Sequence, residues 1–239
     1  MRRFYDPQPF TAGQPATLGA DASHHIARVL RMREGDPLVL FNGEGGEWQA
    51  TLEQVHKSAV VARLEQFNAD DRTPPQAVTL ALPLIKGEKL DYAVQKATEL
   101  GVTRIALVQT ERAEVRLDGE RADKKVRHLR QVAISACEQC GMNRVPELLP
   151  PVSLADWLAQ CESALKLIAH PGEQPFQPEQ VRAVDALALV TGPEGGFTDA
   201  ELALATDAGF IPCALGERVL RAETAPVALL AAFWAWQLG

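Results

Sequence analysis

The sequence predicts an α/β protein with a parallel sheet, preceded by a smaller domain that is mostly β. From residue 77 onward, short apolar runs alternate with segments of helical length, which is the pattern of a parallel sheet with helical connections. Residues 1–70 hold short apolar runs separated by glycine-rich or polar turns, as a set of β-strands requires. Between the two regions, residues 70–76 combine charge with a double proline and are typical of a linker.

The N-terminal region is expected to be a small β domain with one short helix. Its expected strands are 38–41, 48–52 and 60–64. The helix is expected at about Ser23 to Leu30, where His24, Arg28 and Arg31 are spaced i, i+4 and i+7 and would share one face. We expect this basic face to be a docking surface for RNA. A metal site at the adjacent histidines is disfavoured, because neighbouring residues of a helix face different ways.

The C-terminal region is expected to alternate strands and helices. The expected strands are 78–84, 104–109, 165–169, 187–190 and 210–215. The expected helices are 88–100, 120–140, 154–160, 201–208 and 225–238. Gly101 and Gly141 directly follow two of these helices, at the position where glycine commonly ends a helix.

Composition limits the classes of function. No apolar run reaches the roughly 20 residues of a membrane-spanning helix, and no apolar signal region follows the first residues. We therefore expect a cytoplasmic protein that does not enter a membrane. The 4 cysteines are too sparse for a disulfide framework. Cys137 and Cys140 have the spacing of metal ligands, but they lie in a helical pattern without a second pair, so no metal site is expected.

The distribution of charge favours an RNA partner despite a net charge of -7. Residues 1–35 hold five arginines and three acidic residues, and residues 121–144 hold six basic and two acidic residues. Local basic patches on an acidic protein allow phosphate contacts while limiting non-specific binding. A solvated helix face is the alternative interpretation of each patch.

The most informative segment is a glycine-rich loop at residues 192–196. An apolar strand leads into it, and Thr198 with Glu201 forms the T-x-x-E capping box of a helix that starts at once. Such a loop brings backbone N–H groups close to a ligand at the carboxyl end of a strand. No Gly-Lys-Ser/Thr follows, so it is not a Walker A loop, and Glu194 disfavours a polyphosphate. An ordinary strand–helix turn is the alternative.

A second loop of the same kind follows the next strand. Gly216 ends the strand, an Arg-x-x-Arg motif occupies 218–221, and residues 223–226 open the last helix. Pro226 suits the first turn of that helix. Two ligand-ready loops on consecutive strands favour a binding site over two ordinary turns.

These two blocks resemble a known family. Gly-Pro-Glu-Gly-Gly at 192–196 and Leu-Gly-Glu-Arg-Val-Leu-Arg-Ala-Glu-Thr-Ala at 215–225 are similar to the RsmE family of 16S ribosomal RNA uridine-N3 methyltransferases, in the SPOUT superfamily. Further similar blocks lie at 1–5, 25–31, 95–102 and 137–147, so the resemblance covers nearly the whole chain. The sequence departs from the family at Met142, Glu217 and Ala222, where arginine, proline and threonine respectively are frequent.

The resemblance implies the architecture and the reaction. It implies a PUA-like RNA-binding β-barrel at 1–72 and a SPOUT methyltransferase domain at 73–239, with a parallel sheet and a C-terminal trefoil knot at about 165–239. It also implies S-adenosylmethionine as cofactor and N3 of a uridine in the decoding region of 16S ribosomal RNA as the target. A homodimer is implied as well, and the last helix, apolar on nearly all sides, agrees with it. We expect the assembled small subunit to be a better substrate than free RNA.

The expected cofactor pocket combines three loops, the third being residues 170–172 after the strand 165–169. The expected cofactor-binding residues are His170, Gly192, Pro193, Glu194, Gly195, Gly196, Leu215, Gly216, Val219, Leu220 and Thr224. The expected RNA-binding residues are Arg2, Arg3, His24, Arg28, Arg31, Lys86 and Arg144.

Two residues are candidates for the chemistry. Uridine N3 carries a proton and is a poor nucleophile until that proton is lost, so the enzyme must stabilise the anion or supply a base. Arg221 follows the cofactor loop and is the candidate for anion stabilisation. Glu223 either accepts the proton or forms an ion pair with Arg221.

Two other classes of function compete with a methyltransferase. An RNA-binding protein of the same fold without catalysis is disfavoured by the complete set of cofactor loops. A dinucleotide oxidoreductase is expected to carry Gly-x-Gly-x-x-Gly after its first strand, whereas here the first strand of the α/β region is followed by Ile-Lys-Gly-Glu at 85–88.

Overall fold

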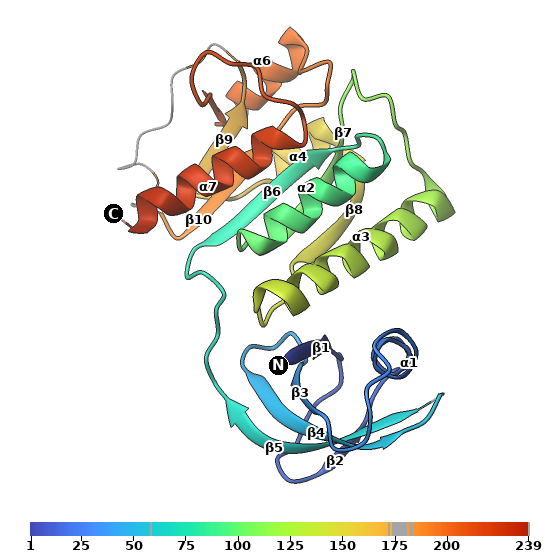
Figure 1. Cartoon of the computed structure of the whole chain (residues 1–239). Helices are drawn as coiled ribbons and strands as arrows, with labels where there is room; N and C mark the ends of the chain where they lie inside the picture. The colour runs from blue at the N-terminus through green and yellow to red at the C-terminus, as the bar shows by residue number, and fades with distance from the viewer. Residues whose placement is uncertain (58, 172, 174–180, 182–183, 239) are drawn as a thin grey trace. The chain divides into compact units, whose positions relative to one another are not determined.

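The computed structural model describes residues 1–57, 59–171, 173, 181 and 184–238, with side chains in the last helix described to residue 235. The chain forms two compact units (Figure 1). Unit 1 contains Met1–Thr73 and Cys137–Val145, and unit 2 contains Pro74–Ala136 and Pro146–Gly239. The inclusion of 137–145 in unit 1 is not evident from the sequence. The functional boundary between residues 72 and 73 stays a prediction.

Unit 1 is built on a five-stranded mixed sheet with the strand order β1-β3-β4-β5-β2. Its strands are β1 (Arg2–Tyr5), β2 (Pro15–Thr17), β3 (Pro37–Phe41), β4 (Glu47–Val55) and β5 (Val60–Asn68). β1 runs parallel to β3, and the other neighbours are antiparallel. The turn between β3 and β4 needs glycine at Gly46, because φ is +68° and a Cβ would come within 2.5 Å of the Phe67 ring.

The helix of unit 1 differs from the expected one. It begins at Ala20 as α1 (Ala20–His24) and continues as a π-helical turn, η1 (His25–Val29), in which the Leu30 N–H donates to the His25 carbonyl at 3.0 Å. Arg31 lies beyond the helix with a left-handed φ of +51°. The prediction that His24, Arg28 and Arg31 share one face of a regular helix is therefore wrong, because the wider π turn changes the spacing and Arg31 is not helical.

The core of unit 1 lies between the sheet and this helix. It combines aliphatic residues of β3, β4 and β5 with Leu18, Ala22 and Ile26. The Ser23 hydroxyl donates to the Leu18 carbonyl at 3.0 Å and accepts from the Val60 N–H at 3.2 Å, which fixes the helix to the start of β5.

Residues 137–145 are held in unit 1 by a partly buried polar network. The Glu47 carboxylate accepts hydrogen bonds from Arg3 and from Arg72, and the Asn143 amide oxygen accepts from the same two arginines at 3.1 Å each. Burial alone would raise the pKa of Glu47, but the hydrogen bonds and charges of Arg72 and Arg3 hold that pKa below its ordinary value. Met142 is 8% exposed and packs with Phe41. This departure from the family pattern is therefore a core residue.

Unit 2 contains a six-stranded sheet with the order β11-β9-β10-β6-β7-β8. Every neighbouring pair is parallel, which confirms the expected parallel sheet. The strands are β6 (Ala77–Pro83), β7 (Arg104–Gln109), β8 (Glu147–Ser153), β9 (Leu165–Ala169), β10 (Ala186–Val190) and β11 (Ile211–Cys213). β8 is absent from the sequence prediction because it contains Pro150 and Pro151, and it tolerates them as the edge strand of the sheet.

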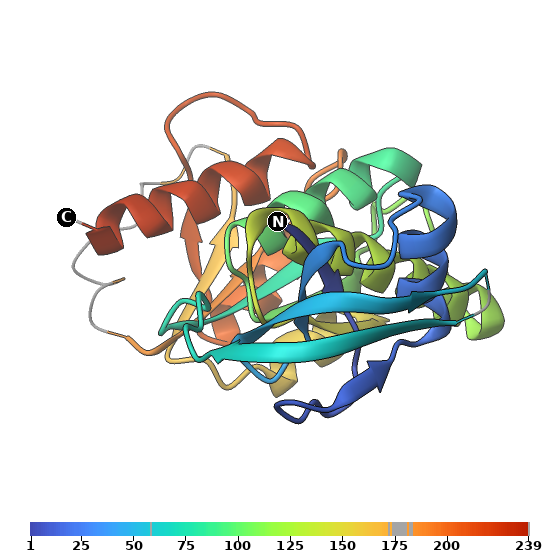
Figure 2. The same ribbon diagram turned by 60° about the horizontal axis from the view of Figure 1, so that its bottom comes forward.

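Helices cover both faces of this sheet. They are α2 (Gly87–Glu99), α3 (Gly119–Cys140), α4 (Leu154–Gln160), α6 (Asp199–Asp207) and α7 (Thr224–Leu238). α2, α3 and α7 lie on one face and α4 on the other (Figures 1 and 2). On the α4 side, Trp157 packs against Phe210 with ring centroids 5.5 Å apart, in a cluster with residues of β6, β7, β9 and β10.

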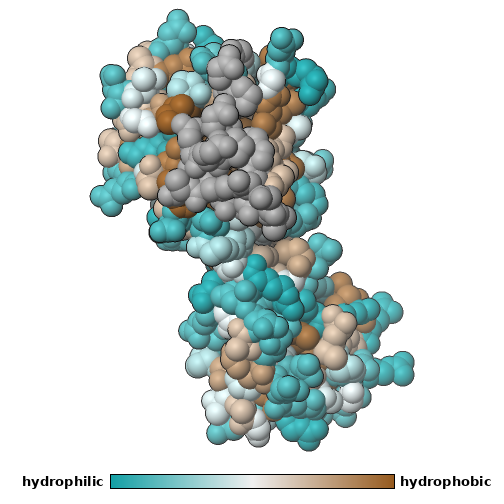
Figure 3. Space-filling model, turned by 90° about the vertical axis from the view of Figure 1, so that its left-hand side faces the viewer, coloured by the Kyte–Doolittle hydropathy of each residue, from teal (hydrophilic) through white to brown (hydrophobic). Residues whose placement is uncertain are grey.

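The polar surface complements the apolar cores of the two units. Hydrophilic residues form much of the surface drawn in colour on the face shown in Figure 3. Among the described residues, no helix combines the length and the apolar character that a bilayer crossing needs. The trefoil knot stays a prediction.

Candidate active site

A cavity of about 500 Å³ lies at the carboxyl edge of the unit 2 sheet. The three strands β11, β9 and β10 are neighbours and run parallel, so the loops that follow them meet at this edge. All three loops line the cavity, as expected, through residues such as His170, Gly192 and Leu215. Gly172 of the third loop lies outside the described residues.

Most of the expected cofactor-binding residues line the cavity, and three do not. Those that do are His170, Pro193, Glu194, Gly192, Gly196, Leu215, Val219 and Leu220. Gly195, Gly216 and Thr224 are not among the lining residues.

The glycine loop has the local structure that its sequence predicts. The capping box is confirmed, because the Thr198 side chain accepts from the Glu201 N–H at 3.2 Å and the Glu201 carboxylate accepts from the Thr198 N–H at 2.8 Å. Gly196 has a left-handed φ of +66°, and its N–H donates to the Pro193 carbonyl at 2.9 Å. A Cβ at Gly192 would lie 3.2 Å from the Phe197 ring, so the loop turns tightly around that buried ring.

Glu194 is held by a lysine from another element. The Lys89 ammonium at the start of α2 lies 3.0 Å from the Glu194 carboxylate. Burial alone would raise the pKa of Glu194, but a bond from its own N–H, the bond from Lys89 and the charges of Lys89 and Lys86 hold that pKa below its ordinary value. The ion pair therefore fixes one side of the loop near neutral pH.

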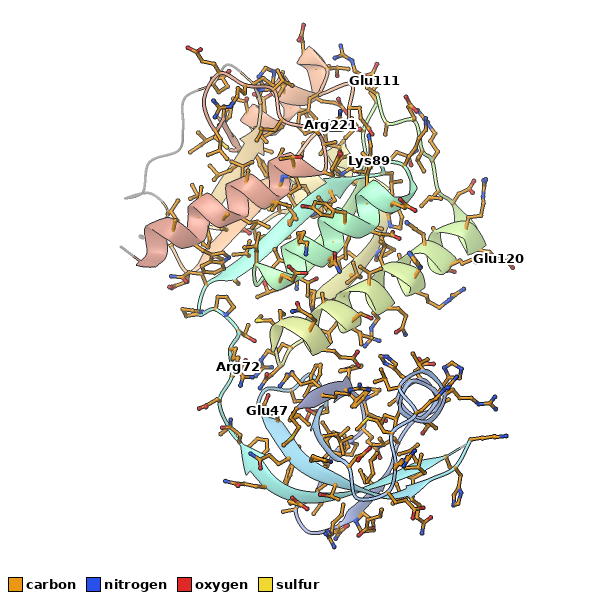
Figure 4. The ribbon with its side chains drawn as sticks, in the orientation of Figure 1. Glu47, Arg72, Lys89, Glu111, Glu120 and Arg221 are labelled. Atoms are coloured by element: carbon orange, nitrogen blue, oxygen red, sulfur yellow. The ribbon has the colours of Figure 1, made fainter. Side chains whose placement is uncertain are left out.

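The charged side chains that line the cavity are predominantly cationic. It contains four basic residues and one acidic residue, namely Lys89, Arg112, Arg218, Arg221 and Glu194. Figure 4 shows Lys89 and Arg221 at the same edge of the sheet. Such a surface favours an anionic substrate or an anion that develops during a reaction.

The two catalytic candidates occupy different positions. Arg221 lines the cavity and is exposed, and its carbonyl accepts from the N–H groups of Thr224 and Ala225 at the start of α7. Glu223 is not a lining residue, and one of its carboxylate oxygens is buried with no hydrogen-bond partner among the described residues. Within the described part of the chain, no ion pair or hydrogen bond joins Glu223 to Arg221. The structure therefore does not contain the pairing that was one of the two expected roles.

The expected RNA-binding residues fall into two groups. Arg2, His24, Arg28 and Arg31 are exposed on unit 1. The others have protein partners: Arg3 bonds to Glu47, Arg144 bonds to Asp71 at 2.7 Å, and Lys86 pairs with Glu114. Arg3 is the most restricted of them, with a side chain only 11% exposed.

No group of three or more His, Cys, Asp or Glu residues with metal-binding geometry occurs among the residues that the structure describes. Burial raises the pKa of Cys137 and of Cys213 to about 12, so both thiols are protonated near neutral pH.

Sequence reasoning missed Lys89 and Arg112 as lining residues. Lys89 follows β6 and Arg112 follows β7. These two strands pair with each other, and β6 also pairs with β10. The sequence predicts these strands but not their order in the sheet, so it gave no reason to place the residues beside the glycine loop.

The fold, the cavity and the matches to known families place the chain in the class of RNA methyltransferases. A family model for an RNA methyltransferase domain matches residues 72–234, and one for an RNA methyltransferase PUA domain matches residues 18–65. The ribosomal RNA small subunit methyltransferase E of Bacillus subtilis is 35% identical over 226 residues, covering 90% of this chain and 88% of the relative. That of Mycobacterium tuberculosis is 34% identical over 239 residues, covering 97% and 90%.

Solved structures give the same relationship. A protein described as a methyltransferase from Legionella pneumophila, with bound S-adenosylmethionine, has a TM-score of 0.93 and 39% identity, covering 98% of this chain and 96% of the other. Ribosomal RNA small subunit methyltransferase E from Neisseria gonorrhoeae, also bound to S-adenosylmethionine, has a TM-score of 0.92 and 35% identity, covering 98% and 97%. The chain therefore belongs to the ribosomal RNA small subunit methyltransferase E family.

Proposed function

We propose that this protein transfers the methyl group of S-adenosylmethionine to N3 of a uridine in the decoding region of 16S ribosomal RNA, on the assembled small subunit. The observation that carries the proposal is the cavity at the edge of the unit 2 sheet, where three adjacent loops meet a set of basic side chains. Membership of the family supports the cofactor and the class of RNA.

The cavity fits the cofactor in size and lining. Its volume of about 500 Å³ lies within the range of small-molecule sites. Ala169, Leu215 and Leu220 offer apolar surface for the adenine, and the glycine loop offers backbone groups for polar atoms. The Thr191 hydroxyl, fully buried at the start of the glycine loop, has no hydrogen-bond partner in the described structure.

The residues of the chain then supply what the reaction at N3 needs. When bound, S-adenosylmethionine supplies an electrophilic methyl group on its sulfonium. Arg221 stabilises the N3 anion through the uracil carbonyl oxygens, as a planar guanidinium at the cavity wall is able to do. The N3 proton leaves to a base, for which Glu223 is the candidate, although it lies beside the lining residues Arg221 and Ala222 and does not line the cavity itself. A bond forms from N3 to the methyl carbon as the bond from sulfur to that carbon breaks.

Unit 1 and the remaining basic residues are assigned to recognition of the RNA. Arg2, His24, Arg28 and Arg31 are exposed on the unit that includes the PUA match, and we assign phosphate contacts to them. Lys86 and Arg144 are assigned the same role. The Lys86 ion pair is largely exposed and the Arg144 side chain is about half exposed, so both can exchange their partners for phosphate. Arg3 instead serves the fold of unit 1, since it is held by Glu47.

The proposal includes a cytoplasmic location and a homodimer. The cytoplasmic location follows from the proposed ribosomal substrate. The described part of α7 carries apolar residues on several sides, and a second copy of the chain would cover those that unit 2 leaves half-buried, such as Val227 and Trp234. Light scattering on the purified protein at micromolar concentration is expected to give twice the 26.0 kDa mass of one chain. A monomeric mass would contradict the dimer.

The test of the proposal combines binding with turnover. S-Adenosylmethionine and its demethylated product are expected to raise the melting temperature, whereas NAD and ATP leave it unchanged. Labelled methyl groups are expected to enter 16S ribosomal RNA of small subunits from a strain that lacks the gene. Cofactor binding without any transfer to subunits or to free RNA would favour the catalytically silent RNA-binding protein.

A further inference from the structure

The loop that follows β7, residues 110–118, contacts the glycine loop through Arg112. The Arg112 guanidinium donates from the same nitrogen to the Gly195 carbonyl at 2.9 Å and to the Phe197 carbonyl at 3.2 Å. These two carbonyls lie on either side of Gly196, the loop residue with a left-handed φ. One side chain therefore connects the two ends of the tight turn.

The capping box provides a second connection between the same two loops. One oxygen of the Glu201 carboxylate accepts from the Thr198 N–H, and the other accepts from the Glu111 N–H, both at 2.8 Å. Figure 4 shows Glu111 at the same edge of the sheet as Arg221. Glu201 therefore both caps α6 and holds the backbone next to Arg112.

The glycine at position 195 fits this arrangement. A Cβ there would lie 3.1 Å from the Arg112 Cβ and 3.5 Å from its Cδ, which is tighter than ordinary contact at the first atom. Gly195 does not have a positive φ, so its backbone conformation does not itself require glycine. The missing side chain of Gly195 therefore leaves room for the stem of Arg112. The sequence suggested instead that it leaves room for a ligand in the cavity, which Gly195 does not line.

We propose that Arg112 is a positioning residue that holds the glycine loop in its cofactor-binding conformation. The inference rests on the proposed function of the cavity and adds a residue from the loop after β7, a strand that carries none of the three cofactor loops. Without the guanidinium, the Gly195 and Phe197 carbonyls lose their connection and the turn at Gly196 samples other conformations. Part of the binding free energy is then used to restore the loop.

Arg112 also lines the cavity, so a direct contact with the methionine carboxylate of the cofactor is the competing role. A fragment of the cofactor separates the two roles. 5′-Methylthioadenosine keeps the adenosine and the sulfur but lacks the amino acid group. If Arg112 holds the loop, its loss weakens the binding of both ligands equally. If Arg112 contacts the carboxylate, its loss weakens the binding of S-adenosylmethionine alone.

The experiment compares Arg112→Met with the matched control Arg116→Met by calorimetry on the full-length protein. Arg116 is exposed in the same loop and does not line the cavity. Methionine keeps the apolar stem beside Gly195 and removes both hydrogen bonds. We expect Arg112→Met to weaken S-adenosylmethionine and 5′-methylthioadenosine by the same factor of about ten, from two lost hydrogen bonds. The control is expected to bind both ligands as the wild type does.

Further readouts separate positioning from a general loss of structure. We expect the KM for S-adenosylmethionine to rise about tenfold in Arg112→Met, with kcat at saturating cofactor within about twofold of wild type. The melting temperature without ligand is expected to fall by only about 3–6 °C, because the two hydrogen bonds to the loop carbonyls are lost while the rest of the fold is untouched. Arg112→Lys keeps one donor and is expected to lie between the wild type and Arg112→Met, which preserves the test if the methionine variant folds poorly.

Three results would overturn the inference. Wild-type affinity in Arg112→Met would show that the loop needs no brace. Weakening of S-adenosylmethionine alone would assign Arg112 to the carboxylate. Failure of the wild-type protein to bind either ligand would overturn the proposed function as well, which distinguishes that failure from the first two.

Discussion

Removal of the Glu201 carboxylate tests how the two loops are joined. Glu201→Ala deletes the bonds from the Thr198 and Glu111 N–H groups, both 2.8 Å long. A hydrogen bond to a charged group contributes about 1.5–3 kcal/mol when removed, and partial exposure places each of these at the low end. We therefore expect a loss of about 3 kcal/mol in the free energy of unfolding. For a chain of this size that loss corresponds to a fall of about 6–12 °C in melting temperature.

Calorimetric melting of three variants and the wild type measures this effect. Glu201→Gln keeps one oxygen acceptor and is expected to lose about half as much as Glu201→Ala. Asp207→Ala, in the last turn of the same helix, is the matched control and is expected to shift the melting temperature by no more than about 2 °C. A melting temperature of Glu201→Ala within 2 °C of wild type would refute the reasoning that this carboxylate joins the loops.

Three further predictions concern chemistry and recognition. Arg221→Lys is expected to lower turnover far more than it weakens either ligand, with partial rescue at higher pH, because more uridine is then deprotonated; normal single-turnover rates with weak RNA binding would show that Arg221 positions the RNA. Alanine at both Arg28 and Arg31 is expected to weaken RNA binding and to lower the salt slope by about one to two, without changing cofactor affinity; an unchanged slope would exclude phosphate contacts there. Cys137 and Cys213 are expected to resist iodoacetamide at pH 8 in mass spectrometry, because burial raises the pKa of each to about 12; rapid alkylation of either in the folded protein would contradict the burial.

Sequence periodicity predicted the regular elements of unit 2 well, because apolar runs and glycine stops reflect local backbone preferences. β7, α4 and β9 have the expected bounds. β8 was missed because its two prolines are acceptable only at the edge of a sheet, and the position of a strand in the sheet is a tertiary property. The π-helical turn η1 was missed for a related reason, since helical spacing alone does not reveal an added residue in a turn.

The candidate site was predictable where its residues lie on the loops that carry the motif. His170, Gly192 and Leu215 follow strands recognisable in the sequence, and they line the cavity. Lys89 and Arg112 were not predictable, because their place depends on the order of strands in the sheet. The same limit applied to Gly195, where the sequence suggests space for a ligand and the structure shows the stem of Arg112.

The most direct test of the proposed reaction is a map of methylated nucleosides in 16S ribosomal RNA. The RNA is compared between a strain that carries the gene, a strain from which it is deleted, and the deletion strain with the gene restored. The proposal predicts that N3-methyluridine at one position in the decoding region is absent only from the deletion strain. An unchanged content of N3-methyluridine in the deletion strain, or the loss of a different modified nucleoside, would contradict it.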